Sequence, residues 1–131
     1  MTTSLTEIST PNAPAAIGPY SQGVQFNGLI FISGQLGLDP QAGTLVGPDV
    51  LNQTQQILLN LAAIAESAKT PLSRLLKLTI YLVDLGDFDA VNQLLQQSLK
   101  QPYPARTTIG VNALPKGARI EIDAILAKAD G

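Results

Sequence analysis

Residues 20–33, YSQGVQFNGLIFIS, contain the strongest local folding signal in the chain. Asn27 and Gly28 stand between two runs of β-prone residues. Both accept the positive φ angles that a two-residue hairpin turn requires. The stretch therefore predicts two antiparallel strands, at 20–26 and 29–33, joined by the Asn-Gly turn.

Before the hairpin, residues 1–19 predict an irregular N-terminal segment that contains one short strand, LTEIS, because three prolines interrupt TPNAPAAIGP. After it, apolar residues at helical spacing predict a helix at about 48–68 and another that carries Phe88, Val91, Leu95 and Leu99. Further strands are expected at 75–83, 105–113 and 118–127, the last two joined by the turn LPKG. The order predicts a single α+β domain, 1–131, a two-layer sandwich with two helices on one mostly antiparallel six-stranded sheet.

The composition excludes several kinds of chemistry. The chain has no cysteine and no histidine, so thiolate nucleophiles, histidine general bases and Ser-His-Asp triads are ruled out. With a net charge of −2, no basic field is present to attract nucleic acid. No Lys or Arg precedes Lys69, and no apolar run reaches the roughly 18 residues of a membrane span. We therefore expect a cytoplasmic protein with no membrane association.

Alternation along the strands predicts one apolar and one polar face for the sheet. In 75–83 and 118–127 the even positions, including Leu76, are apolar and the odd positions are mostly polar. In 105–113, Ile109 and Val111 are expected to oppose a polar face that carries Arg106, Thr108 and Asn112. The polar face either meets water or is covered by other subunits. Because charged residues make up only 14% of the chain, we expect an oligomer with ligand sites at its interfaces.

Five motifs together resemble the RidA (YjgF) family of reactive-intermediate deaminases. They are APAAIGPYSQGV, FISGQ, VDLGDFDAVN, PARTTIGV and LPKGARIEIDAI, and they follow the order and spacing of that family from about Asn12 to Ala127. The resemblance implies a chorismate-mutase-like fold and a homotrimer with three ligand sites between subunits. It also implies hydrolysis of 2-imino acids, such as 2-iminopropanoate and 2-iminobutanoate, to 2-oxo acids and ammonia. This reaction protects pyridoxal-phosphate enzymes.

Carried onto this sequence, the resemblance implies catalytic roles for Arg106, Glu121 and Tyr20. It implies substrate binding by Arg106 and by a further set: Thr108, Ser33, Gly34 and Asn92. No metal and no organic cofactor are expected. The guanidinium of Arg106 suits substrate binding, because it binds a planar carboxylate through two parallel hydrogen bonds and keeps its charge.

Each of these residues also has a purely structural interpretation. Arg106 would form an ion pair that holds the end of its strand, with an acid of this chain or of a neighbouring subunit. Glu121 would pair across strands with Arg119 or Lys77. Tyr20 would be an aromatic wall or a core residue. Ser33 would simply end a strand, and Asn92 would be an ordinary exposed helix residue.

One position departs from the family pattern. Where many relatives have cysteine, Thr108 follows Thr107 here, so no thiol acts at this site. If this position binds the substrate through its backbone N–H, threonine serves as well as cysteine. If its side chain shapes the pocket, the β-branched Thr108 would narrow it. Two other functions stay open: a trimer that binds or senses 2-oxo acids without turnover, and a ribonuclease or translation inhibitor. The acidic composition and the missing histidine disfavour the latter.

Overall fold

The Asn27-Gly28 hairpin forms as predicted in the computed structural model, which describes residues 4–130. Strand β2 (Gly23–Phe26) pairs antiparallel with β3 (Leu29–Gln35), and the turn residues have φ angles of 49° and 79°. The first strand of the hairpin, β2, begins at Gly23 rather than at the predicted residue 20. Tyr20 therefore lies in the loop that leads into the hairpin.

The remaining strands complete a six-stranded sheet in the order β1-β2-β3-β6-β4-β5. They are β1 (Thr6–Ile8), β4 (Leu75–Leu82), β5 (Ala105–Gly110) and β6 (Ile120–Ala127). Every neighbouring pair is antiparallel except β4 and β5, which are parallel. The predicted α+β class with a mostly antiparallel sheet is confirmed. The last strand of the chain lies in the middle of the sheet, and β5 forms one edge.

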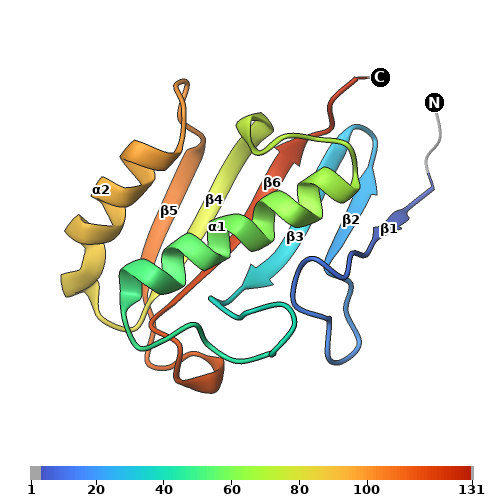
Figure 1. Ribbon diagram of the computed structural model, residues 1–131. Coiled ribbons are helices and arrows are strands. Elements are labelled where there is room, and N and C mark those ends of the chain that lie inside the picture. The colour runs from blue at the N-terminus through green and yellow to red at the C-terminus, as the bar shows by residue number, and fades with distance from the viewer. Residues whose placement is uncertain (1–3, 131) are drawn as a thin grey trace.

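Two helices cover one face of this sheet (Figure 1). Helix α1 (Val50–Ser67) crosses β6 and β3, and α2 (Phe88–Ser98) lies beside it over the β5 edge. Three single turns of 3₁₀ helix connect the strands and helices: Leu72–Arg74, Leu85–Asp87 and Pro115–Gly117. No helix within residues 4–130 combines the length and the apolar character needed to cross a membrane. The opposite face of the sheet, called the open face below, carries neither helix.

The core lies between α1, α2 and the sheet. The even positions of β6 and most of those of β4 point into it, and Ile120, Ile122, Ile80 and Leu82 are almost fully buried. The prediction was wrong for Leu76, which is 45% exposed. An irregularity in the pairing with β6 places Leu75 in the core instead.

The predicted faces of the β5 strand were also wrong. Arg106 pairs with Leu78, and Thr108 pairs with Ile80, so both lie on the face that the helices cover. Ile109 pairs with Tyr81 and lies on the open face, where it is 42% exposed. The strand ends at Gly110, before the predicted Val111 and Asn112. An edge strand tolerates this reversal because α2 covers its helix face only in part.

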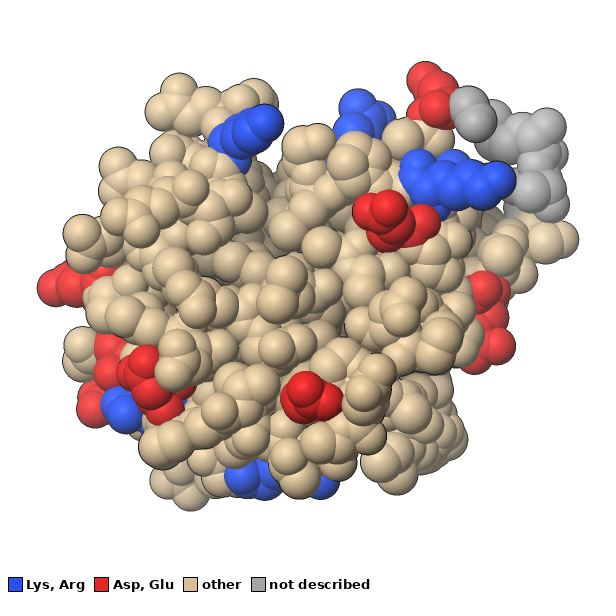
Figure 2. All heavy atoms as spheres, in the orientation of Figure 1, with Lys and Arg blue, Asp and Glu red and all other residues tan. Residues whose placement is uncertain are grey.

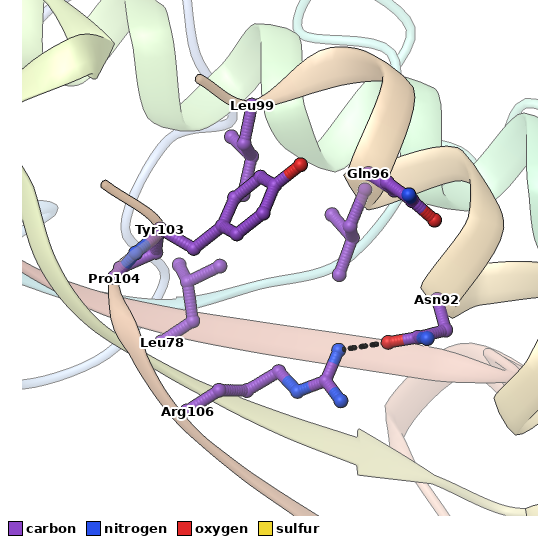
Figure 3. Close-up of a pocket in the computed structure, with 8 residues that line it drawn as sticks. Leu78, Asn92, Gln96, Leu99, Tyr103, Pro104 and Arg106 are labelled. Atoms are coloured by element: carbon purple, nitrogen blue, oxygen red, sulfur yellow. Dashed lines mark hydrogen bonds between the residues drawn. The ribbon is translucent and has the colours of Figure 1, made fainter. Parts of the chain in front are cut away.

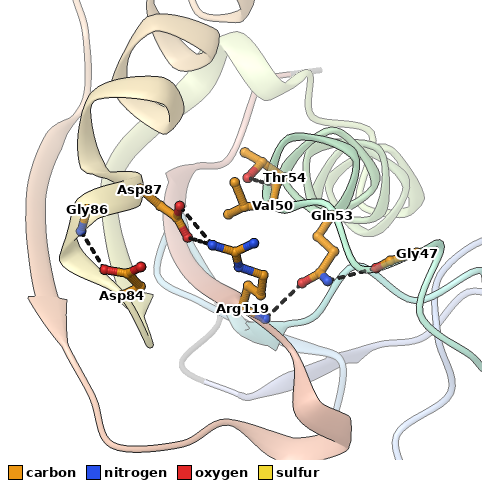
Figure 4. Close-up of polar contacts among 8 residues, drawn as sticks. All are labelled: Gly47, Val50, Gln53, Thr54, Asp84, Gly86, Asp87 and Arg119. Atoms are coloured by element: carbon orange, nitrogen blue, oxygen red, sulfur yellow. Dashed lines mark hydrogen bonds and ion pairs between the residues drawn. The ribbon is translucent and has the colours of Figure 1, made fainter.

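A polar cluster explains why the last strand begins at Ile120 rather than at residue 118 (Figure 4). The Arg119 guanidinium donates two hydrogen bonds to Asp87, at 2.8 and 2.9 Å, and its backbone N–H donates to Gln53 Oε1 at 2.9 Å. The buried Gln53 amide donates in turn to the Gly47 carbonyl at 2.8 Å. These bonds connect the start of α1, the start of β6 and the residue before α2.

The proline-containing N-terminal segment is held by the buried side chain of Gln22. Its amide oxygen accepts from the Thr10 N–H at 2.7 Å, and its NH₂ group donates to the carbonyls of Thr10 and Pro14 at 3.0 and 2.8 Å. This segment is irregular, as predicted, with one short strand at β1. Residues 1–3 of the predicted segment lie outside the described residues.

The surface over the helices carries few charges (Figure 2). Lys, Arg, Asp and Glu side chains lie mainly around its rim, and uncharged residues occupy its centre. This view agrees with the low charged content of the chain.

Candidate active site

Arg106 lies on the helix face of β5 and reaches toward α2 (Figure 3). Its Nη1 donates a hydrogen bond of 2.6 Å to Asn92 Oδ1. The guanidinium carbon lies 5.3 Å from the centroid of the Phe88 ring, which is within the range of a cation–π contact. Phe88 and Asn92 are four residues apart on α2 and therefore lie on the same side of the helix. One helix face thus holds the guanidinium at two points.

Both groups that hold Arg106 are uncharged. Among the described residues, no carboxylate lies within ion-pair distance of Arg106, and the salt bridge found there joins Arg119 to Asp87. The structural interpretation of Arg106 as one half of an ion pair within the chain is therefore wrong. No carboxylate of residues 4–130 neutralises its positive charge, and this arrangement suits an anionic ligand.

A cavity of about 430 Å³ opens beside this guanidinium (Figure 3). Arg106 and Asn92 lie at one side of it, and Tyr103 lies across from them. The leucines Leu78, Leu95 and Leu99 supply an aliphatic wall. A charged fork beside an aliphatic wall has the chemistry to hold a small carboxylate that carries an alkyl group.

Thr108 shares the helix face of β5 with Arg106, two residues farther along the strand. Its hydroxyl oxygen is buried and has no hydrogen-bond partner within the described part of the chain. A buried hydroxyl without a partner costs free energy, so an additional partner would stabilise it. We call Arg106, Asn92, Phe88 and Thr108 the arginine group.

Glu121 occupies the open face of β6, where its carboxylate lies against the backbone of Gly34. A Cβ atom added at Gly34 would lie 2.9 Å from Glu121 Cδ, closer than real Cβ atoms approach, and closer still to the carboxylate oxygen Oε2. Gly34 therefore leaves the space that the Glu121 side chain fills. The family resemblance implied substrate binding at Gly34, and the structure shows that its missing Cβ also makes room for the Glu121 side chain.

Ser33 precedes Gly34 in β3, and a hydrogen bond connects it to the loop that contains Tyr20. The Ser33 hydroxyl donates to the Ser21 carbonyl at 2.6 Å, which joins β3 to the loop that contains Tyr20. Ser33 lies inside β3 and does not end it. The Tyr20 side chain is 53% exposed, and its hydroxyl accepts a 3.3 Å hydrogen bond from the Ile17 N–H. The alternative interpretation of Tyr20 as a core residue is therefore wrong. We call Glu121, Gly34, Ser33 and Tyr20 the glutamate group.

The environment of Glu121 favours its protonated form. Burial raises the pKa of Glu121, and the nearby charge of Asp123 raises it further. The proposed pairing with Arg119 is wrong, because that guanidinium binds Asp87. No ion pair to Lys77 forms within residues 4–130 either.

The two groups lie on opposite faces of the sheet. Arg106 pairs with Leu78 on the helix side, and Glu121 pairs with Tyr81 on the open side. The strand β4 also separates them, so their backbones are roughly 14 Å apart for strands spaced about 4.8 Å and a rise of about 3.3 Å per residue. One subunit cannot place both side chains on adjacent atoms of one small molecule.

Sequence reasoning missed three residues around these groups: Phe88, Tyr81 and Asp123. Phe88 was assigned to the apolar stripe of its helix, and only its 37% exposure and its contact with Arg106 distinguish it. Tyr81 and Asp123 were placed on the polar face, but their contact depends on strand register, which no local signal encodes. Residues 4–130 contain no group of three or more His, Cys, Asp or Glu side chains able to hold a metal ion.

The fold places the chain in a known class of α+β proteins. Its structure superposes on RidA from an Antarctic Psychrobacter with a TM-score of 0.90 and 42% identity, over 93% of this chain and 98% of that one. It also superposes on Escherichia coli TdcF with bound serine, with a TM-score of 0.87 and 36% identity, over 95% and 99% of the two chains.

The sequence relatives agree with this class. Residues 10–128 match the family described as endoribonuclease L-PSP. The goat protein named 2-iminobutanoate/2-iminopropanoate deaminase is 48% identical over 90% of this chain and 86% of its own length. The chain belongs to the RidA (YjgF) family, as its motifs indicated.

Proposed function

We propose that this protein hydrolyses short 2-imino acids, such as 2-iminopropanoate and 2-iminobutanoate, to 2-oxo acids and ammonia. The reaction consumes one water: its oxygen forms the new C=O bond, and the C=N nitrogen leaves as ammonia with the water's two protons. Removal of these imines would protect pyridoxal-phosphate enzymes. The names of the relatives support the substrate class, since the goat protein is called a deaminase of these imino acids.

The single observation that carries the proposal is the uncompensated charge of Arg106. A guanidinium held by the amide oxygen of Asn92 and the ring of Phe88 is fixed in place without being neutralised. The substrate carboxylate would supply the missing negative charge and bind the fork. The Thr108 hydroxyl, two residues away on the same face, would donate a further hydrogen bond to the ligand.

Glu121 would act on the water. Its carboxylate accepts a proton as the water oxygen attacks the imine carbon and passes that proton to the nitrogen, which gives a carbinolamine. It then takes the hydroxyl proton of the carbinolamine and delivers it to the nitrogen as the C=O bond forms, the C–N bond breaks and ammonia leaves. A raised pKa suits this double role, because the group must both take and release a proton near neutral pH.

We infer that the active site forms between two subunits of a homotrimer. Arg106 and Glu121 lie on opposite faces of one sheet, so the arginine group of one copy must meet the glutamate group of another for both to act on one imine. Tyr20 and Ser33 would then border the ligand from the side of the second copy. The exposed aromatic and aliphatic side chains of the open face and its edge, such as Phe31 and Ile109, favour burial by another copy.

The activity is tested by competition for the imine. A serine dehydratase generates 2-iminopropanoate while semicarbazide traps it, and the purified protein is added at increasing concentration. We expect the protein to divert imine from the trap to pyruvate, whereas its Arg106→Ala variant does not. If the parent protein diverts no imine, the proposed activity is wrong.

The shared site is tested by mixing two inactive variants. Arg106→Ala and Glu121→Gln subunits are denatured together and refolded, and activity is compared with each variant refolded alone. If each site takes one residue from each of two copies, an equal mixture has about one intact site in four. If both residues came from one copy, every site would lack one of them and no activity would return. Light scattering of the parent protein checks the trimer mass.

The same variants separate hydrolysis from binding alone. A protein that only binds 2-oxo acids needs Arg106 but not Glu121, so Glu121→Gln would leave its function unchanged. The location in the cytoplasm, expected from the composition, stays a prediction that fractionation of cells would check.

A further inference from the structure

Three titratable side chains lie together on the open face of the sheet. Glu121 and Tyr81 are direct partners across β6 and β4, and Asp123 is the next residue of β6 on the same face. The Tyr81 hydroxyl does not point at its direct partner. It donates a hydrogen bond of 2.7 Å to Asp123 Oδ2 instead. The phenol therefore spans the strands diagonally and fixes the second carboxylate beside the first.

The surroundings leave the charge of Asp123 without a close cation. From β4 the only other charged side chain on this face is Lys77, and no described residue forms an ion pair with Asp123. Arg119 precedes β6 and binds Asp87. The neighbouring strands β3 and β5 contribute uncharged residues to this face, among them Phe31, Gly34, Thr107 and Ile109. The fixed partner of Asp123 is thus a neutral phenol.

We propose that Asp123, oriented by Tyr81, is a positioning residue that makes Glu121 a stronger proton acceptor for the water that attacks the imine. The inference rests on the proposed function, because it assigns that acceptor role to Glu121. The role assigned to Asp123 requires no contact with the substrate. It acts through its negative charge, which penalises a second negative charge on the same face.

The electrostatics of the cluster agree with its geometry. Burial comes first and the charge of Asp123 second among the causes that raise the pKa of Glu121. The hydrogen bond to Asp123, followed by burial and by the charges of Asp123 and Glu121, raises the pKa of Tyr81 to about 12. Tyr81 therefore keeps its proton at neutral pH and remains a donor to Asp123.

The first test measures kcat/KM against pH for the parent protein and for Asp123→Asn, with the imine-trapping assay. Loss of the negative charge should move the acid limb of the profile to lower pH. At the pH where the parent has half of its plateau activity, the variant should retain clearly more than half of its own plateau. Glu66→Gln is the matched control, because it removes an exposed carboxylate on α1, over the other face of the sheet. It should leave the limb unchanged.

The second test does not depend on the reaction. In ligand-free protein with ¹³C-labelled glutamate, the carboxyl resonance of Glu121, assigned by its absence in Glu121→Gln, is followed through a pH titration. Its midpoint should fall in Asp123→Asn. In Tyr81→Phe, which keeps the charge but loses the hydroxyl, it should fall less.

The outcomes separate the two proposals. If the parent protein does not hydrolyse the imine, the proposed function fails, and a shifted midpoint still shows that Asp123 acts on Glu121. If the parent is active but Asp123→Asn changes neither the acid limb nor the midpoint, Asp123 has only a structural role and the inference is overturned. A shift of equal size in Glu66→Gln would overturn it as well, because it would report net charge alone.

Discussion

Arg106 donates a hydrogen bond of 2.6 Å to the amide oxygen of Asn92, and no carboxylate among the described residues neutralises it. The strand residue and the helix residue are brought together only by the packing of α2 over the β5 edge. The contact fixes the direction of the guanidinium and leaves its charge for a ligand. A ligand-binding role for this charge explains why one of only three arginines in the chain lies on an edge strand.

Arg106→Lys should lose most of the activity. An ammonium is a point charge and cannot form two parallel bonds with a carboxylate. We expect kcat/KM to fall about 10- to 150-fold, which corresponds to the 1.5–3 kcal/mol typical of a hydrogen bond to a charged group. Arg74→Lys is the matched control, because Arg74 is exposed and donates to the Ala127 carbonyl, away from the cavity. Equal activity in the two variants would remove Arg106 from the carboxylate site.

Asn92→Asp should weaken ligand binding and preserve the fold. The new carboxylate would occupy the position of the amide and pair with Arg106, and it would then compete with the substrate. We expect roughly tenfold weaker binding of 2-oxobutanoate by calorimetry, with no loss of thermal stability. Asn92→Ala removes the acceptor without adding a charge, so it should weaken binding less. Tighter binding in Asn92→Asp would contradict the role of the free charge.

Gly34→Ala should reduce turnover, because it displaces the side chain of Glu121. The backbone of Gly34 does not have the positive φ angles that favour glycine, so alanine is compatible with it. Its Cβ atom would displace the end of the Glu121 side chain, and a displacement of about 1 Å costs on the order of 100-fold in rate. The double variant Gly34→Ala/Glu121→Ala relieves the clash. It should be more stable than additivity predicts, and strictly additive melting temperatures would show that the two residues do not interact.

Glu121→Gln should stabilise the protein at neutral pH. The raised pKa of Glu121 means that the folded state binds its proton more tightly than the unfolded state does. The stability that Glu121 contributes through this proton is therefore fully present below the ordinary glutamate pKa. It is lost as the pH rises through the raised pKa of the folded state. Melting temperatures at a fixed protein concentration should fall over this range for the parent and less for the variant. Parallel curves would contradict the raised pKa.

Thr108→Val should raise the stability of the protein and weaken its binding of the substrate. The hydroxyl of Thr108 is buried without a partner, so valine of similar shape should stabilise the ligand-free protein by about 1 kcal/mol. If the hydroxyl donates to the substrate, KM should rise in the same variant. Thr107→Val on the other face of β5 is the control and should leave KM unchanged. A variant that gains stability with an unaltered KM would exclude Thr108 from the ligand site.

Local signals in the sequence determined the elements of this fold. The turn at Asn27-Gly28 depends only on the φ angles that these two residues accept, and helix α1 follows from apolar residues repeated along a single stretch. Such signals act between near neighbours, so a sequence contains them in full. The family motifs likewise pointed to Arg106 and Glu121 before any contact was known.

Only the tertiary structure decided on which face each of these residues lies. Alternation predicts that Arg106 and Ile109 lie on opposite faces, but which face receives the helices depends on the parallel register of β5 with β4. Arg119 is similar: its sequence neighbours suggest a partner on the sheet, yet Asp87, 32 residues away, binds it. Register and long-range pairing are set by how the whole core packs, and the free energy that selects them is spread over many contacts that no short stretch contains.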